Sequence, residues 1–229
     1  MDEVGTDGLT HLDKDKQRFL SLTGVAMRVD YVRDEFARNL DLIKARVFEH
    51  DPDDPIVFHR KDIMGLKGPY ECLRDVGKKA LFDEMILKLF QDSEYTVITA
   101  LIDKKWMVAQ EHWARNEPYH FLMEILVEKY LQFLERMGTI GDIMPESRQS
   151  KDDLLQKAFD GLRRGGCAYV SAPRIASAIR AKTLKFRTKL HSILRVWAPC
   201  QPGINLRVPV LRPRAARLSS VARVVGILF

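Results

Sequence analysis

The chain has 229 residues, of which 46% are hydrophobic, 30% charged and 9% aromatic. This composition is typical of a globular protein with a core, and it excludes the disordered and collagen-like classes. The apolar runs are shorter than the ~18 residues of a membrane span, and the acidic start Met1-Asp2-Glu3 is unlike a signal peptide. We therefore expect a cytoplasmic protein without a membrane segment.

The net charge of +6 combines two parts of opposite sign. Residues 161–229 contain 14 lysines and arginines and no acidic residue, so residues 1–160 carry a net charge of −8. A basic C-terminal third beside an acidic body predicts either a surface that binds nucleic acid or an abnormal tail. The cysteines form no CxxC pair and the histidines show no spacing such as HExxH, so neither a disulfide framework nor a zinc site is expected.

Patterns typical of strands and of amphipathic helices alternate along the chain. Short apolar runs predict the strands, and apolar residues that recur at helical spacing predict the helices. In chain order, the expected elements are a strand over 19–27, a helix over 31–48, a strand over 56–58, a helix over 75–90, a strand over 95–102, a helix over 118–137, a strand over 139–144, a helix over 150–162 and a strand over 167–170. The strand over 95–102 is rich in β-branched residues, so we expect it to be buried on both faces.

This alternation predicts an α/β protein with a mixed, largely central sheet that helices cover. The predicted domain comprises residues 1–189. From about residue 190 the pattern ends, because four prolines interrupt the chain and the basic residues are all arginine. Residues 190–229 are therefore predicted to be an irregular basic tail, either an out-of-frame translation product or a segment that binds nucleic acid.

Carboxylates occur where strands begin or end. Asp2 and Glu3 precede a glycine-rich turn, Asp103 ends the strand over 95–102, and Glu146 follows the strand over 139–144. Carboxylate oxygens are the ligands that Mg²⁺ and Mn²⁺ prefer. If two of these residues converge, they predict a metal-dependent nuclease. Asp103, which two lysines follow, is also explained as a solvated charge at a strand end, the more common role of an isolated acidic residue.

Other polar residues have a structural and a functional interpretation. His59 is a candidate general acid/base or phosphate contact, although a hydrogen-bonded structural histidine is the more common outcome. Asp152 and Asp153 are explained by the start of a helix, where acidic side chains interact favourably with the helix dipole. We assign these two aspartates no catalytic role.

Several short motifs occur in the order found in a bacterial family. Residues 2–8, DEVGTDG, resemble the Asp-Glu-Ser-Gly signature that opens the domain family of unknown function numbered thirty-eight hundred, which is considered RNase H-like. Further segments that resemble this family are 19–25 (its second strand), 58–59 (its short strand with a histidine), 102–104 (the end of its central strand) and 146–148 (its Glu-x-Arg motif). The resemblance covers residues 2–189.

The resemblance implies an RNase H-like mixed central sheet flanked by helices, and Mg²⁺- or Mn²⁺-dependent phosphodiester hydrolysis. Asp2 on the first strand and Glu146 would be the main metal ligands and catalytic residues. Glu3 and Asp7 would be supporting acids, and His59 an acid/base. This chain departs from the family in its short first strand, in Val4 where the family usually has serine, and in having no late aspartate after residue 189. These departures predict reduced or absent activity.

Basic residues near the end of the predicted domain suggest contacts to a nucleic-acid backbone. The alternating segment 183–189 predicts a strand with its basic side chains on one face, suited to phosphates without reading sequence. The candidate contacts are Arg148, Lys185, Arg187 and Lys189. The alternatives are a solvated edge strand, a binding module without catalysis, and a frameshifted product without function.

Overall fold

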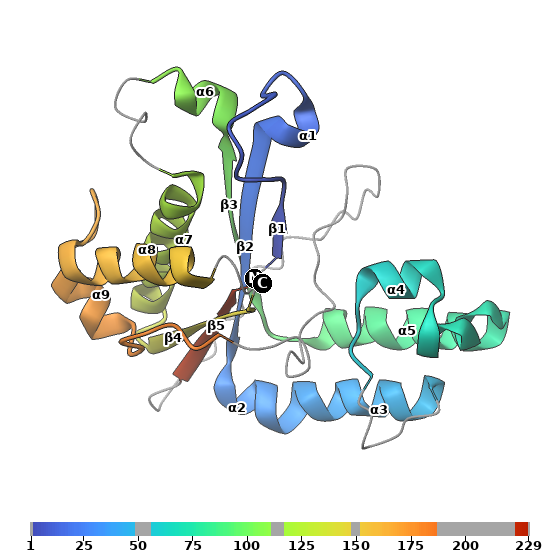
Figure 1. Ribbon diagram of the computed structural model, residues 1–229. Coiled ribbons are helices and arrows are strands. Elements are labelled where there is room, and N and C mark those ends of the chain that lie inside the picture. The colour runs from blue at the N-terminus through green and yellow to red at the C-terminus, as the bar shows by residue number, and fades with distance from the viewer. Residues whose placement is uncertain (1, 49–55, 111–116, 148–151, 187–222, 229) are drawn as a thin grey trace.

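The computed structural model describes residues 2–48, 56–110, 117–147, 152–186 and 223–228 (Figure 1). The chain is a mixed α/β protein that is mostly helical, with a small sheet at its centre. In these ranges no helix is long and apolar enough to cross a membrane. For residues 2–4 and 223–228 the structure describes the backbone.

The sheet is organised around one long strand. β2 (Phe19–Arg28) pairs antiparallel with β3 (Thr96–Asp103) along nearly its whole length. On its other side, β2 pairs antiparallel with β1 (Asp2–Val4) and with β5 (Arg223–Leu228). β4 (Ile140–Pro145) runs parallel to β5.

β1 and β5 follow one another along the same side of β2. Asp2 pairs with Thr23, and Leu228 pairs with the next residue of β2, Gly24. The C-terminal strand therefore extends the line of the short first strand, and it connects β2 to β4.

The helices, in chain order, are α1 (Asp15–Arg18), α2 (Val29–Tyr31), the π-helical turn η1 (Val32–Phe36), α3 (Ala37–Val47), α4 (Arg60–Gly65), the 3-10 helix η2 (Gly68–Arg74), α5 (Val76–Asp92), α6 (Lys104–Val108), α7 (Pro118–Arg136), α8 (Asp152–Gly165) and α9 (Ala172–Ala178). Figure 1 shows α7, α8 and α9 on one side of the sheet. α3, α4 and α5 extend away from the sheet at the C-terminal end of β2, where α2 follows.

Two cores lie on opposite faces of β2. Leu20 and Leu22 are fully buried in a mainly aliphatic core, called the aliphatic core below, that includes Leu131 and Leu134 of α7. The second core contains Val25 and Met27 of β2. It also contains four aromatic rings in contact with one another, which belong to Phe48, Phe58, Tyr70 and Phe82. Side chains alternate between the faces of a strand, so one strand contributes to both cores.

The structure confirms the expected α/β class, the strands at 19–27, 95–102 and 139–144, and the helices at 31–48, 75–90 and 118–137. α8 confirms the helix expected over 150–162, although the predicted cap Ser150 lies outside the described residues. The expectation that 95–102 is buried on both faces is wrong, because Val97 and Leu101 are 43% and 62% exposed. β3 has a helix-covered face and an open face.

Two expected strands are absent from the described chain. Residues 56–58 are extended but pair with no strand, and the Val57 carbonyl accepts a hydrogen bond from the Tyr70 hydroxyl at 2.7 Å. Residues 167–170 form a tight turn in which the Cys167 amide donates to the Val170 carbonyl at 2.8 Å. The described part of 183–189, residues 183–186, is not a strand either. The amide of Leu184 instead donates to the Gln156 side chain at 3.0 Å.

Candidate functional site

The register of the sheet brings two predicted metal ligands to nearly the same level. Asp2 pairs with Thr23. Glu146 directly follows Pro145, which pairs with Leu228, and Leu228 pairs with Gly24. One further step along β4 brings Glu146 close to the level of Thr23. Since neighbouring strands lie ~4.8 Å apart, the backbone positions of Asp2 and Glu146 are about one strand spacing apart.

The strand alternation also determines the face on which Glu146 lies. Ile143 of β4 is buried in the core beneath α7, so Glu146, an odd number of residues further on, belongs to the opposite face. Thr23 is on that face as well, because its neighbour Leu22 faces α7. There the Thr23 hydroxyl lies 3.0 Å from the hydroxyl of Thr99. Glu146 and Thr23 therefore belong to the same face of the sheet, on which Thr23 itself is buried.

Glu3 and Asp7 occupy the strand and the turn that follow Asp2. Glu3 pairs with Leu22 in the ladder. The chain then turns at Gly5, whose φ of +102° and close approach to the Phe19 carbonyl leave no room for a side chain. Asp7 is half-buried in this turn and lies near the ammonium of Lys104.

Lys104 is fully buried and holds this turn in place. Its Nζ donates hydrogen bonds to the carbonyls of Thr6 at 2.5 Å and Gly8 at 2.6 Å. Burial lowers the pKa of Lys104, and the charge of Asp7 opposes that shift. Asp7 is therefore placed as a counter-charge to Lys104, beyond the end of β1 rather than beside Asp2.

Asp103 is a structural ion-pair partner and not a solvated charge. Its carboxylate accepts two hydrogen bonds from Nε of Arg18, at 2.9 and 3.0 Å, and a further one from the same guanidinium. It also caps α6 by accepting from the amides of Lys105 and Trp106. These hydrogen bonds, with that of Arg18 first, lower the pKa of Asp103 to about 2.

His59 lies apart from the acidic candidates. It precedes α4, which Figure 1 shows well away from β1. Its Nδ1 is 2.8 Å from a carboxylate oxygen of Asp62, one helical turn further on. The structure therefore gives His59 a local partner and does not bring it to Asp2 or Glu146.

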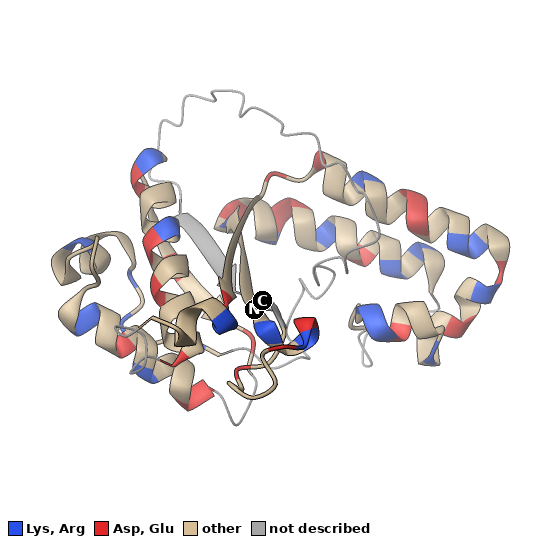
Figure 2. Cartoon of the chain, turned by 90° about the horizontal axis from the view of Figure 1, so that it is seen from above, with Lys and Arg blue, Asp and Glu red and all other residues tan. Residues whose placement is uncertain are grey.

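The candidate nucleic-acid contacts lie mostly outside the described residues. Arg148, Arg187 and Lys189 belong to these undescribed segments, and Lys185 is exposed. Several basic residues of the C-terminal third have partners within the fold, since Arg163 donates to the Ile179 carbonyl at 2.9 Å and Arg174 pairs with Glu135 at 2.8 Å. Along α3 and α5, acidic and basic residues are interspersed (Figure 2).

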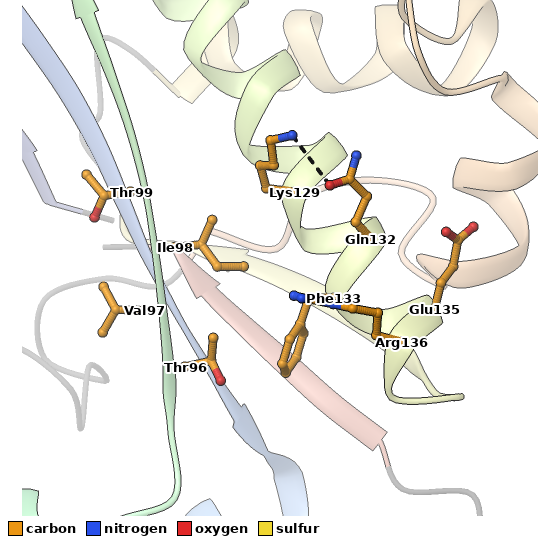
Figure 3. A pocket seen from close by; sticks show the side chains of 9 residues that line it. All are labelled: Thr96, Val97, Ile98, Thr99, Lys129, Gln132, Phe133, Glu135 and Arg136. Carbon is orange, nitrogen blue, oxygen red and sulfur yellow. Dashed lines mark hydrogen bonds between the residues drawn. The ribbon is translucent and has the colours of Figure 1, made fainter. Parts of the chain in front are cut away.

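A groove of about 890 Å³ lies between the first half of β3 and the last turns of α7 (Figure 3). Ile98 and Phe133 give it an apolar floor, and its polar lining includes Lys129 and Arg136. None of the predicted acidic residues lines this groove, so it is distinct from the candidate metal site.

Asp2 and Glu146 are of a residue type that suits a hard cation. Mg²⁺ is commonly held by one or two carboxylates and keeps several waters for its other positions. In the part of the chain whose side chains are described, no group of three or more acidic, histidine or cysteine side chains converges.

Comparison with models of protein families, with curated proteins and with solved structures found no match.

The role of Lys104 was not predicted from the sequence. The signal was present in the strand pattern, because Ala100 and Ile102 face the core and Lys104 follows at the same spacing. The partnership of Arg18 with Asp103 had no such signal, since the two residues are 85 positions apart.

Proposed function

We propose that this protein is a divalent-metal-dependent phosphodiester hydrolase with an RNase H-like sheet. The observation that carries the proposal is the register, which brings Asp2 and Glu146 to neighbouring positions on adjacent lines of the sheet. The ordered motifs that resemble the family numbered thirty-eight hundred support the same assignment. β5 supports it further, because it extends the short β1 along β2.

The proposed chemistry needs few groups. Bound between the carboxylates, Mg²⁺ or Mn²⁺ would supply charge neutralisation at a phosphate and a water of lowered pKa. Asp2 and Glu146 would hold the ion, and a nucleic-acid strand would approach from the face of the sheet to which Glu146 belongs. The local pairing of His59 with Asp62 supports no role for His59 in this site.

The test is cleavage of labelled single- and double-stranded DNA and RNA by the full chain, with Mg²⁺, with Mn²⁺ and with EDTA. We expect metal-dependent cleavage that Asp2→Asn and Glu146→Gln abolish. Glu84→Gln, a matched change of an exposed carboxylate on α5, should leave cleavage intact. Cleavage that persists in EDTA, or in both site variants, would contradict the proposal.

The second candidate is a module that binds nucleic acid without cleaving it. The observation that favours it is the charge of residues 161–229, which include 14 basic residues and no acidic residue. Binding that weakens steeply with salt, without cleavage under any metal condition, would support this candidate. A chain without a cooperative melting transition would instead support the frameshifted product without function.

A further inference from the structure

The outer edge of β3 is long, and its residues 96–102 carry no charge. β3 pairs with β2 over Thr96–Asp103, and no described strand pairs with its other edge. Such an edge presents a row of main-chain donors and acceptors that readily pair with another strand. Proteins usually protect an edge with lysine, proline or a bulge, but residues 96–102 contain no charged residue and no proline.

The open face of β3 presents apolar side chains on both sides of a central threonine. Val97 is 43% exposed and Leu101 is 62% exposed, and the exposed Thr99 lies midway between them. Figure 3 shows Val97 and Thr99 on the side of β3 away from α7, and Ile98 on the side of the helix. The open face therefore has the symmetrical order apolar, threonine, apolar.

The charges that flank β3 have opposite signs at its two ends. Asp92 and Glu94 are exposed just before the strand, whereas the exposed Lys105 follows it. Asp103 does not cancel Lys105, since its carboxylate is bound to Arg18. In an antiparallel pair of two such strands, the acidic beginning of one lies beside the basic end of the other. A parallel pair would bring like charges together.

We propose that the edge of β3 is a dimerisation surface that pairs with β3 of a second copy of this chain, antiparallel about a two-fold axis at Thr99. Val97 then lies opposite Leu101 of the partner subunit, and this apolar pair occurs twice because the interface is isologous. Glu94 lies near Lys105 of the partner subunit. The groove between β3 and α7 leaves room beside the edge for the incoming strand.

The first experiment measures the mass of the full chain by light scattering after gel filtration, over a range of protein concentrations. We expect a dimer, and a twofold fall in mass for Leu101→Lys, which places a charge within the apolar pair. Leu87→Lys is the matched control, because Leu87 is 52% exposed on α5, away from the edge. A monomer at all concentrations, or a dimer that Leu101→Lys leaves intact, overturns the proposal.

The second experiment tests the register and does not depend on how a charged variant folds. Thr99→Cys places two sulfurs at the two-fold axis, where the backbones of paired strands are close enough for a disulfide. Mild oxidation should cross-link Thr99→Cys into dimers well above the background of the unsubstituted chain. Val76→Cys, at an 82% exposed position on α5, should stay at background. Equal cross-linking of the two variants, or none in Thr99→Cys, contradicts the symmetric pairing.

Discussion

The two faces of the sheet are covered to different extents. The aliphatic core under α7, α8 and α9 extends across β2, β3 and β4. The aromatic core with α3 and α5 reaches only the end of β2, at Val25 and Met27. Elsewhere on that second face, Thr99 and Leu101 of β3 are exposed, whereas Thr23 of β2 is buried. One face of the sheet therefore contributes along most of its width to a buried core, while on the other face β3 presents exposed side chains.

The largest effects are expected from cavities in the two cores. Phe48→Ala removes a ring whose centroid lies 5.5–5.8 Å from three other rings, and Leu131→Ala removes a fully buried side chain of α7. Each should lower the free energy of unfolding by about 3–5 kcal/mol. Urea titration should show one shifted transition in both cases, because β2 belongs to both cores. Two transitions, with each variant moving only one, would show that the two sides fold independently.

Loss of the Lys104 ammonium should have an intermediate effect. Lys104→Met keeps most of the side-chain volume but leaves the carbonyls of Thr6 and Gly8 without their donor. We expect a loss of about 1–3 kcal/mol in the free energy of unfolding. Lys105→Met, at the exposed neighbouring position, should leave stability nearly unchanged in the same thermal melts. Equal losses of stability in the two variants would mean that the hydrogen bonds of Lys104 to the turn do not stabilise the fold.

A side chain at Gly5 should destabilise the turn after β1. A Cβ there would lie 2.2 Å from the Phe19 carbonyl oxygen, in addition to the cost of a positive φ, about 1–2 kcal/mol. Gly68→Ala is the control, because Gly68 also has a positive φ but no atom within 4 Å of the added Cβ. Gly5→Ala should therefore lower the melting temperature more than Gly68→Ala. The reverse order would argue against the close approach of Gly5 to β2.

The smallest effect is expected from the ion pair at the end of β3. The pKa of Asp103 is about 2 in the folded chain and 3.8 for an ordinary aspartate, so its ionised form stabilises the fold. That contribution is complete above pH ~4 and is lost as the pH falls towards 2. Asp103→Asn should therefore melt at a lower temperature than the unsubstituted chain at pH 7, and the difference should shrink in acid. A difference that grows in acid would contradict this assignment.

Local patterns predicted the elements whose boundaries are set by neighbouring residues. α7 begins at Pro118 and ends before Gly138, where φ is +60°, and both residues are visible in the sequence. Ile56 and Phe58 are buried, as expected of strand residues, but they pack among the aromatic rings without a strand partner. Burial and pairing give the same apolar pattern, so the sequence could not distinguish them.

The candidate site was predicted as residue types but not as an arrangement. Asp2 and Glu146 were identified because acidic residues flank strands, whereas their level in the sheet depends on pairing with β2 and β5. A register between distant segments leaves no local signal. His59 was predicted from a segment that resembles the family's short strand. The structure instead gives His59 a hydrogen-bond partner nearby in the sequence, Asp62.

The central place of β2 has a consequence for the order of folding. Thr23 and Thr99, which meet in the sheet, are 76 positions apart, whereas α3, α4, η2 and α5 follow one another over 37–92. Contacts between near neighbours close small loops and form early, and contacts of high sequence separation form late. During synthesis, the aromatic helices can therefore pack while β2 still lacks β3. Until residue 103 has been made, β2 has only the short β1 as a strand partner, and its apolar residues lack the cover that β3 and α7 later provide.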